Sequence, residues 1–502
     1  MITHSTDTKT RLGNKITILI PARKYIMNVA WTEEKPIPAI ELFACRLLVL
    51  FERMSPFELR EFFGLSEREE EELLNSLEDK RLATLDSQGY LMPSPLLLSQ
   101  AGQGEGAPML VKYNEQTEHV VFDAFALTVR KEQRLGRLMF GLPELPMPES
   151  SKDLGMDIII EEFGRQFRSY LEISRHNEHE RQRTQLYKVM GGSPSDLLQL
   201  PVDIEFTYQY AQGEPKQWIR SVERLGSNQT RPLSSELESH IADFLGSNYI
   251  NESGSDAETY CQLAKDDVLK RFTKGYQIDY SEWMFAREEK KTGYGSPNTR
   301  GVFGPIYLYE NRREAIEWIR KALRLHEDIT DLKALWIPAN VPFWGANSED
   351  LDKFVQELKK VLETKSENSK ISLVHQGEHW NVRSHLRNIF PYEFSTPIEH
   401  DRIELLVVPG IFALVQYHGQ PNADSGVSVP IGYMTTEPER VEHLEKVFRS
   451  KIGDFKHLNS SWPSFMKANE SAVSQGIIPE SWTDKALFRK ANRNRPILSL
   501  NK

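Results

Sequence analysis

The densest gathering of side chains able to do acid–base or metal chemistry lies between residues 375 and 400. It contains His375, Glu378, His379, His385 and His400. Histidines and a carboxylate that converge on one point can bind zinc or share proton transfer. Adjacent residues such as Glu378 and His379 would point about 100° apart on a helix, and no HExxH or other paired-ligand spacing occurs. We therefore predict no metal site. We favour the interpretation that these are polar loop and helix-start residues near the edge of a sheet. His400, Glu378 and His379 remain the alternative catalytic residues.

A second candidate pair is Arg320 and His326, whose spacing is like that of the catalytic residues in some helical ribonucleases. The same segment carries apolar residues at Ile316, Ile319 and Leu323, the pattern of a helix packed against a sheet. We therefore predict that Arg320 and His326 lie on the solvated face of this helix.

The last 18 residues are basic, in contrast to the chain as a whole. They contain no acidic residue and six basic ones: Lys485, Arg489, Lys490, Arg493, Arg495 and Lys502. Charge this asymmetric attracts polyanions or an acidic partner. The residues predicted to contact nucleic acid are Arg489, Lys490, Arg493 and Arg495. A solvated, fraying terminus is the alternative.

Net charge, cysteine content and hydropathy limit the class of protein to which this chain can belong. The 502 residues carry 62 Lys and Arg against 72 Asp and Glu, a net charge of −10, so the surface as a whole repels phosphate backbones unless positive charge is concentrated locally. Cys45 and Cys261 are too few for a disulfide framework or a zinc site, which fits a reducing cytoplasm. No apolar run reaches the roughly 20 residues of a membrane span. We expect a cytoplasmic protein of about three domains, with no cofactor and no membrane contact.

Residues 36 to 95 carry the clearest local signals. A nearly all-apolar helix is predicted first. Two capping boxes, with Ser55 and Ser66 as the N-caps, open a second and a third helix, and Gly64 ends the second. A short hairpin from Leu82 to Met92 follows. Three helices and a hairpin in this order resemble a winged helix-turn-helix domain.

In winged helix-turn-helix domains the third helix normally enters the major groove of DNA. Here the predicted third helix, Glu67 to Lys80, carries seven acidic and two basic residues. A helix that binds DNA phosphates by releasing their counterions needs an excess of positive charge, whereas this helix is negative. We therefore predict that this module docks a protein rather than DNA. The predicted partner-binding residues are Glu69, Glu70 and Glu72.

The middle of the chain, from residue 109 to 300, has mixed signals. Two hairpins are predicted: Met109 to Tyr113 with His119 to Phe122, and Val202 to Tyr210 with Gln217 to Val222. Two helices are predicted: Asp157 to Tyr170, and a segment capped at Ser255 that runs to Phe272. Before this region, Ile16 to Ile20 is predicted as a strand.

From residue 302 onward, strands and helices alternate. Predicted strands are Val302 to Tyr309, Leu332 to Ile337, Ile371 to Val374, Ile403 to Val408, Phe412 to Gln416 and Val427 to Tyr433. Predicted helices are Arg312 to Leu325, a segment capped by Ser348 that runs to Leu362, and one that opens at Thr436 and runs to Ile452. The second and third strands, with the helix between them, form a predicted β-α-β unit.

The order of these elements resembles one lobe of the phospholipase D superfamily, over roughly residues 302 to 453 and in hydrophobic pattern rather than in motif. In active members a histidine, a lysine two positions later and an aspartate several positions further on form the phosphodiesterase signature, in which the histidine attacks phosphorus. Alignment on the strand from Leu405 to Val408 puts Arg402, Glu404 and Pro409 at these three positions.

All three positions depart from the family pattern. Arginine stays protonated and cannot act as a nucleophile, and a glutamate would repel the phosphate that the lysine should bind. The resemblance therefore implies an inactive site. A shift of two residues would place His400 at the nucleophile and Arg402 at the cation, but it leaves no carboxylate at the third position. Both alignments remain open at this stage.

Together these signals predict an α+β protein with an N-terminal winged helix, a mixed middle region and a C-terminal α/β phospholipase D-like lobe. The predicted boundaries are 1–98, 109–300, 301–455 and, for a basic extension, 456–502. By resemblance, such modules combine in bacterial nucleic-acid-processing or anti-phage defence systems. We expect a non-catalytic accessory subunit that docks a helicase or nuclease subunit and contacts DNA or RNA. The alternative is a phosphodiesterase or nuclease that uses His400 or the His375 to His385 cluster.

Overall fold

Helices and strands both occur along the chain, which confirms the predicted α+β class. The computed structural model describes residues 9–36, 38–101, 109–175, 177–210, 216–226, 229–248, 256–274, 277–326, 332–367, 369–377, 385–390, 392–421, 426–451 and 456–457. None of the helices in these ranges is both long and apolar enough to cross a bilayer.

Internal contacts divide the chain into two compact units that are interleaved along the sequence. The N-terminal unit comprises Ala22–Glu132 and Glu149–Leu198; the C-terminal unit comprises Met1–Pro21, Gln133–Pro148 and Gln199–Lys502. Two long strands, β1 (Lys9–Pro36) and β6 (Thr184–Tyr210), contribute residues to both units. The strand predicted at Ile16 to Ile20 is therefore part of a much longer one. The four segments predicted as domains remain a prediction.

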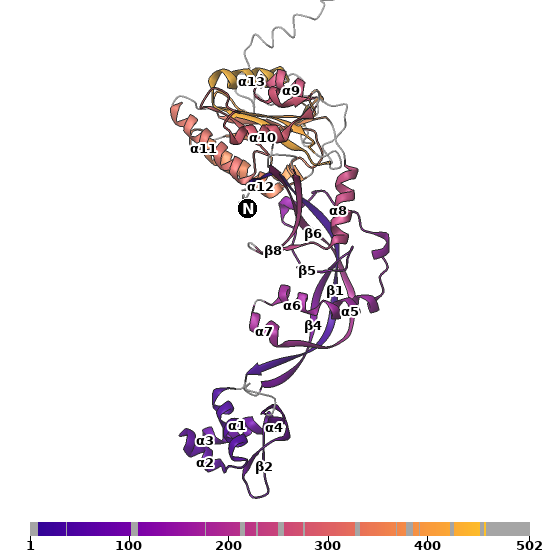
Figure 1. The fold of residues 1–502 in the computed structure, drawn as a ribbon, viewed down its shortest axis with the longest axis vertical. Coiled ribbons are helices and arrows are strands. Elements are labelled where there is room, and N and C mark those ends of the chain that lie inside the picture. Colours follow the sequence, from indigo (N-terminus) through magenta and orange to yellow (C-terminus); the bar gives the residue numbers. More distant parts are fainter. Residues whose placement is uncertain are drawn as a thin grey trace, which may run out of the picture. The chain divides into compact units, whose positions relative to one another are not determined.

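Within the N-terminal unit, residues 39–101 form what we call the helical module (Figure 1). It consists of α1 (Ala39–Phe51), α2 (Pro56–Phe63), α3 (Glu67–Asp79), the hairpin of β2 (Ala83–Leu85) and β3 (Leu91–Pro93), and α4 (Pro95–Ala101). Both predicted capping boxes are present, at Ser55 and Ser66. Gly64 ends α2 with φ 66°, a left-handed conformation that glycine adopts without steric cost. The local signals of this module are confirmed.

The remainder of the N-terminal unit contains β4 (Met109–Asp123), β5 (Val129–Arg130), η2 (Glu149–Ser151), α5 (Met156–Arg165), α6 (Phe167–Ser174) and α7 (Glu178–Arg183). The hairpin predicted from Met109 to Phe122 is wrong. Residues 114–118, which resemble a turn by their polarity, continue β4 opposite β1, from Met109 beside Pro36 to Asp123 beside Ala22. A partner strand that is distant in sequence has overridden the local pattern.

The single helix predicted from Asp157 to Tyr170 is interrupted at Gln166, which has φ −103° and ψ 13°. The Gln166 side chain accepts a hydrogen bond from the backbone N–H of Val129 at 2.9 Å and donates one to the carbonyl of Leu127 at 2.8 Å. The break therefore coincides with hydrogen bonds to β5 and to the residues before it, which lie outside the helix.

The C-terminal unit is built on an eight-stranded sheet with the order β11-β17-β16-β15-β12-β13-β14-β18. Its strands are β11 (Thr299–Phe303), β12 (Lys333–Ile337), β13 (Lys370–Gln376), β14 (Tyr392–Thr396), β15 (Ile403–Val408), β16 (Phe412–Gly419), β17 (Val429–Thr435) and β18 (Lys456–His457). Figure 1 shows helices over both faces, among them α11 (Tyr309–Leu325), α12 (Ser348–Glu363) and α13 (Pro438–Lys451). The predicted β-α-β unit is confirmed by the parallel pairing of β12 with β13.

The other elements of the C-terminal unit are β7 (Lys216–Gly226), β8 (Gln229–Pro232), β9 (Thr273–Lys274), β10 (Gln277–Ile278), α8 (Ser235–Ser247), α9 (Ala257–Ala264), α10 (Tyr280–Glu288), η1 (Arg137–Met139) and η3 (Leu269–Phe272). The hairpin predicted after residue 202 is confirmed, because β6 and β7 are antiparallel with Val202 opposite Glu223.

Two predicted boundaries near the sheet are wrong. The strand predicted from Val302 to Tyr309 ends at Phe303, because Gly304 turns the chain with φ 82°, and Tyr309 begins α11. The predicted cap of α12 is displaced by one residue, since the side chain of Asn347 accepts from the first turn of the helix.

The helix predicted to run as far as Phe272 ends at Ala264, where Lys265 adopts φ 52°. Buried Asp266 follows and accepts hydrogen bonds from the hydroxyls of Tyr260 and Tyr294 at 3.0 and 3.1 Å. Burial raises the pKa of Asp266, and these hydroxyls oppose the rise. The helix therefore ends immediately before a carboxyl group that is held in the core by two tyrosine hydroxyls.

Candidate functional site

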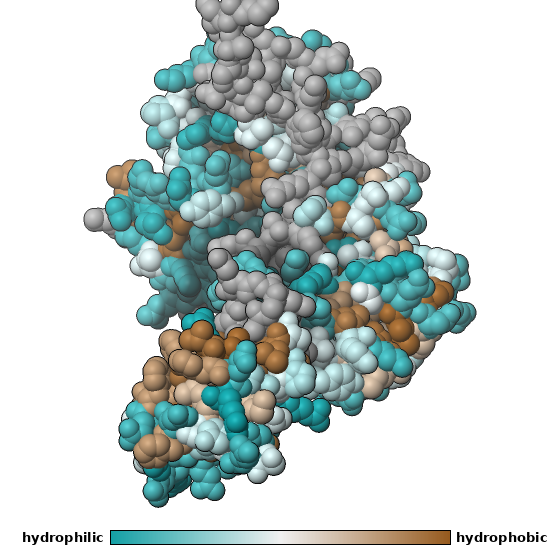
Figure 2. Space-filling model, turned by 60° about the horizontal axis from the view of Figure 1, so that its bottom comes forward, coloured by the Kyte–Doolittle hydropathy of each residue, from teal (hydrophilic) through white to brown (hydrophobic). Residues whose placement is uncertain are grey.

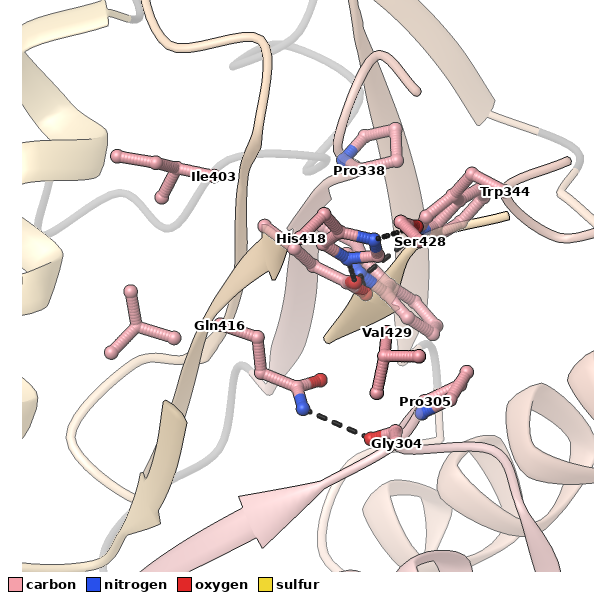
Figure 3. Close-up of polar contacts among 12 residues, drawn as sticks. Gly304, Pro305, Pro338, Trp344, Ile403, Gln416, His418, Ser428 and Val429 are labelled. Carbon is pink, nitrogen blue, oxygen red and sulfur yellow. Dashed lines mark hydrogen bonds and ion pairs between the residues drawn. The ribbon is translucent and has the colours of Figure 1, made fainter. Parts of the chain in front are cut away.

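A buried carboxylate lies in the polar network that is drawn in part in Figure 3. Glu404 of β15 is 1% exposed. Its Oε1 accepts a hydrogen bond from Trp336 Nε1 at 2.7 Å, and its Oε2 accepts one from Trp344 Nε1 at 3.1 Å. Trp336 belongs to β12, and Trp344 lies between β12 and α12. Both carboxylate oxygens are therefore occupied by donors from the protein itself.

His418 of β16 extends this network to a hydroxyl group. Its Nε2 lies 2.6 Å from Glu404 Oε2, and its Nδ1 lies 3.0 Å from Ser428 Oγ. Figure 3 shows the imidazole ring beside Ser428. The backbone carbonyl of Ser428 accepts a hydrogen bond from Asn14 Nδ2 at 2.7 Å. A carboxylate, an imidazole and a hydroxyl are thus linked in series.

Strand pairing brings these groups together. β15 and β16 are antiparallel neighbours in which Glu404 lies opposite Gln416. Alternate residues of a strand face the same side of a sheet, so Gln416 and His418 share the face of Glu404. Gln416 Nε2 donates to the carbonyl of Gly304 at 3.0 Å (Figure 3), whereas its buried Oε1 has no hydrogen-bond partner among the described residues.

A carboxylate, an imidazole and a hydroxyl in series can activate a serine nucleophile. That chemistry also needs the hydroxyl to meet a substrate, and Ser428 and His418 are only 3% and 2% exposed. A buried carboxylate is costly unless it is paired and hydrogen-bonded. The indoles of Trp336 and Trp344 and the imidazole of His418 provide the partners that the buried carboxylate of Glu404 requires. We therefore interpret the network as one that holds β12, β15 and β16 together.

The three positions aligned with the phosphodiesterase signature have different surroundings. Arg402 is half-buried, and its Nη1 donates to the Tyr417 hydroxyl at 3.3 Å. Burial raises the pKa of Tyr417, and Arg402 opposes this rise. Pro409 lies in the turn between β15 and β16. Glu404, at the position of the lysine, would repel a phosphate rather than bind it.

The two buried histidines of the predicted cluster have separate surroundings. His375 Nε2 lies 3.5 Å from Glu393 Oε1 on the neighbouring strand. The ring nitrogens of His385 each lie 3.1 Å from a backbone carbonyl oxygen, those of Gly141 and Gly345. These contacts connect different segments of the chain.

His400 donates its backbone N–H to Gln376 Oε1 at 3.2 Å. Glu378 and His379 lie outside the described residues. The same is true of the predicted nucleic-acid contacts Arg489, Lys490, Arg493 and Arg495. In the ranges that are described, no group of three His, Cys, Asp or Glu side chains could hold a metal ion.

The three glutamates predicted to bind a partner have contacts within the helical module. Glu69 accepts hydrogen bonds from the backbone N–H and the hydroxyl of Ser66, and these bonds lower its pKa. Glu70 lies 3.3 Å from Arg60. Glu72 lies 3.0 Å from Arg68, one turn earlier in the same helix. Part of the acidity of α3 is therefore neutralised inside the module.

Sequence reasoning singled out Glu404 but missed His418 and Ser428. One signal was present: a glutamate inside the apolar run from Ile403 to Val408 requires buried partners. A histidine two residues beyond Gln416, in the next strand of the hairpin, satisfies that requirement because of the two-residue period of strands. The tryptophan partners carried no comparable signal, since the pairing of β12 with β15 joins segments far apart in the chain.

No protein-family model matches the chain, and no curated protein matches it. A phospholipase D family member, Nuc from Salmonella typhimurium, is 11% identical with a TM-score of 0.22, over 33% of this chain and 100% of that one. NucT from Helicobacter pylori is 7% identical with a TM-score of 0.20, over 32% of this chain and 99% of that one. TrmBL2, an archaeal chromatin protein with a novel mode of DNA binding, is 10% identical with a TM-score of 0.20, over 83% of this chain and 94% of that one. Likeness at this level carries no conclusion about activity.

Proposed function

We propose that the chain is a non-catalytic accessory subunit of a bacterial nucleic-acid-processing or anti-phage defence complex. Its helical module acts as a winged helix that docks a helicase or nuclease subunit, and its C-terminal part contacts nucleic acid. One observation carries the non-catalytic role: the carboxylate of Glu404 is saturated inside the sheet by Trp336, Trp344 and His418.

Phosphodiester cleavage needs a nucleophile at phosphorus and cations that stabilise the charge of the transition state. In the phospholipase D pattern a histidine stands where the chain has Arg402, whose guanidinium is not a nucleophile, and a lysine stands where the chain has Glu404. The lobe keeps the hydrophobic pattern of a phosphate-handling fold without the groups that break the bond. Such a lobe is suited to binding.

Exposed apolar side chains on the helical module support protein docking. On α1, Phe43, Leu50 and Phe51 are 52%, 72% and 57% exposed, and on α2, Phe57 and Phe62 are 55% and 63% exposed. Figure 2 shows apolar residues gathered on the module, at the bottom of the view. Apolar patches of this kind on a protein surface mark interaction sites.

The chemistry of the partner follows from the charge of the same module. α3 presents the exposed carboxylates of Glu67, Glu71 and Glu78 beside these apolar helices. A partner segment that combines apolar side chains with lysines or arginines would match both features. The proposed partner surface is therefore a basic amphipathic segment of the helicase or nuclease subunit.

A hydrolysis assay tests the non-catalytic role. The purified full chain, with divalent metal added, should not cleave bis(4-nitrophenyl) phosphate, nor labelled single- or double-stranded DNA and RNA. Cleavage that disappears in a folded His400→Ala variant would contradict the proposal and support a phosphodiesterase instead.

Copurification tests the docking role. The tagged chain, isolated from its source cells, should carry a helicase or nuclease subunit in a fixed ratio, identified by mass spectrometry. Phe43→Ser with Leu50→Ser should remove that subunit. Ile158→Ser is the matched control, because this side chain is 43% exposed on α5, outside the helical module. A chain that purifies alone, or a partner retained by the double variant, would contradict this surface.

A further inference from the structure

The exposed face of α11 forms a groove of about 410 Å³ with a residue of α12. Five cationic side chains and two carboxylates line this α11 groove. The local excess of positive charge contrasts with the net charge of −10 of the whole chain. Positive charge concentrated on one face of an acidic protein is the electrostatic footprint of a site for polyanions.

Helical periodicity arranges three of these cations in a row. Arg313, Arg320 and Arg324 follow each other at intervals of seven and four residues, which places them on one face. At 1.5 Å per residue, the distance from Arg313 to Arg324 is about 16 Å along the axis. A stacked strand advances 3.4 Å per phosphate, so the row spans roughly five steps from one phosphate to the next.

Part of this charge is not neutralised by the protein. Lys321 pairs with Glu317 at 2.7 Å, and buried Arg312 lies 3.4 Å from Glu357. Arg320 and Arg324 are exposed and lie within ion-pair distance of no carboxylate that the structure describes, although the closer Lys321 and, at longer range, Arg320 lower the pKa of Glu317. The solvated position predicted for Arg320 is confirmed, and it leaves the guanidinium available to a phosphate.

An aromatic ring lies at the start of the row. Tyr309, the first residue of α11, is 63% exposed. The guanidinium carbons of Arg312 and Arg313 lie 5.7 and 5.9 Å from the centre of its ring. An exposed aromatic ring beside a track of cations is how proteins bind single strands, whose bases are free to stack. Paired bases in a duplex do not offer their faces in this way.

We propose that the α11 groove binds the sugar–phosphate backbone of single-stranded nucleic acid, with the ring of Tyr309 stacked on a base. This inference rests on the proposed function and gives its nucleic-acid contact a surface among the described residues. Arg320 and Arg324 bind phosphates as forked donors. The residues that line the groove lie between 309 and 357, outside the basic extension that the sequence places at residues 456–502.

Fluorescence anisotropy of the full chain with fluorescein-labelled oligo(dT) of about 20 nucleotides, over a series of salt concentrations, tests the groove. Arg320→Ala with Arg324→Ala should weaken binding about tenfold and reduce the slope of log K against log salt by about 1.4, or about 0.7 per phosphate contact. Tyr309→Ala should weaken binding about 5- to 100-fold with little change in slope.

Lys359→Ala with Lys360→Ala is the control, since it removes the same charge from α12 outside the groove and should leave binding unchanged. Wild-type affinity in both groove variants would overturn the inference. If deletion of residues 485–502 then abolished binding, only the groove would be wrong and the proposed nucleic-acid contact would stand. If the unaltered chain bound neither oligo(dT) nor duplex DNA or RNA, both the groove and the proposed nucleic-acid contact would be wrong. Tighter binding of duplex than of single strand would overturn the stacking role of Tyr309.

Discussion

The side chain of Glu404 lies within hydrogen-bond distance of two indole N–H groups and of a ring nitrogen of His418, so an amide in its place could not keep all three contacts. In Glu404→Gln, an amide N–H would face the N–H of a tryptophan or of His418, at sites now 2.6 to 3.1 Å apart. A buried polar group left without a partner costs about 1–3 kcal/mol, and breaking a buried charged pair costs more. We expect Glu404→Gln to lower the free energy of unfolding by about 2–4 kcal/mol, measured by urea denaturation.

Glu439→Gln provides the matched comparison, because Glu439 is exposed in the first turn of α13. Its effect should stay within about 0.5 kcal/mol, as for most surface substitutions. Equal stability losses in the two variants would mean that the network around Glu404 is not what stabilises this part of the sheet. A folded Glu404→Gln variant that had lost a hydrolytic activity would instead point to a catalytic role.

At the scale of elements, the capping box of α3 predicts a pH-dependent stability. Hydrogen bonds from Ser66 lower the pKa of Glu69 in the folded chain. A lowered pKa means that the stabilisation is present above the unfolded value of about 4.3 and is lost as the pH falls through the folded value. Amide hydrogen exchange at the start of α3 should therefore be faster in Glu69→Ala than in wild type at pH 7. The difference should vanish at a pH below the folded pKa.

Glu71→Ala is the control for this experiment. Glu71 is exposed in the same helix, two residues beyond Glu69, and takes no part in the capping box. It should leave exchange at the start of α3 close to that of wild type at every pH. A difference between Glu69→Ala and wild type that persisted in acid would show that the carboxylate form of Glu69 is not what stabilises the helix start.

For the whole molecule, charge predicts how the C-terminal extension contributes to binding. Deletion of residues 485–502 removes six cations and no acid, which takes the net charge from −10 to −16. A more negative chain repels a phosphate backbone more strongly. We expect this deletion to weaken binding of oligo(dT) and to lower its salt slope, measured by the same anisotropy assay.

A chain whose last 18 residues are scrambled keeps the same charge and should bind like wild type. Combining the deletion with Arg320→Ala and Arg324→Ala should lower the affinity further than either change alone, since each change removes cations that the other leaves in place. Unchanged affinity and salt slope after the deletion would show that the extension does not contribute to binding.

Signals that act over a few residues were readable from the sequence. The capping boxes at Ser55 and Ser66, the glycine stop at Gly64 and the β-α-β unit are present as predicted. Caps form between residues three apart, and a helix face repeats every three or four residues, so a short stretch of sequence contains all the information needed.

Contacts between distant segments were decided only in the folded chain. β4 continues through a polar stretch because β1 supplies its hydrogen-bond partners, and the helix break at Gln166 coincides with hydrogen bonds from its side chain to the backbone of Val129 and Leu127. Glu404 is buried because Trp336, Trp344 and His418 converge on it from three segments of the C-terminal unit. Whether a glutamate repels a ligand or stabilises a core depends on which donors the fold brings within about 3 Å of it. No local pattern encodes that arrangement.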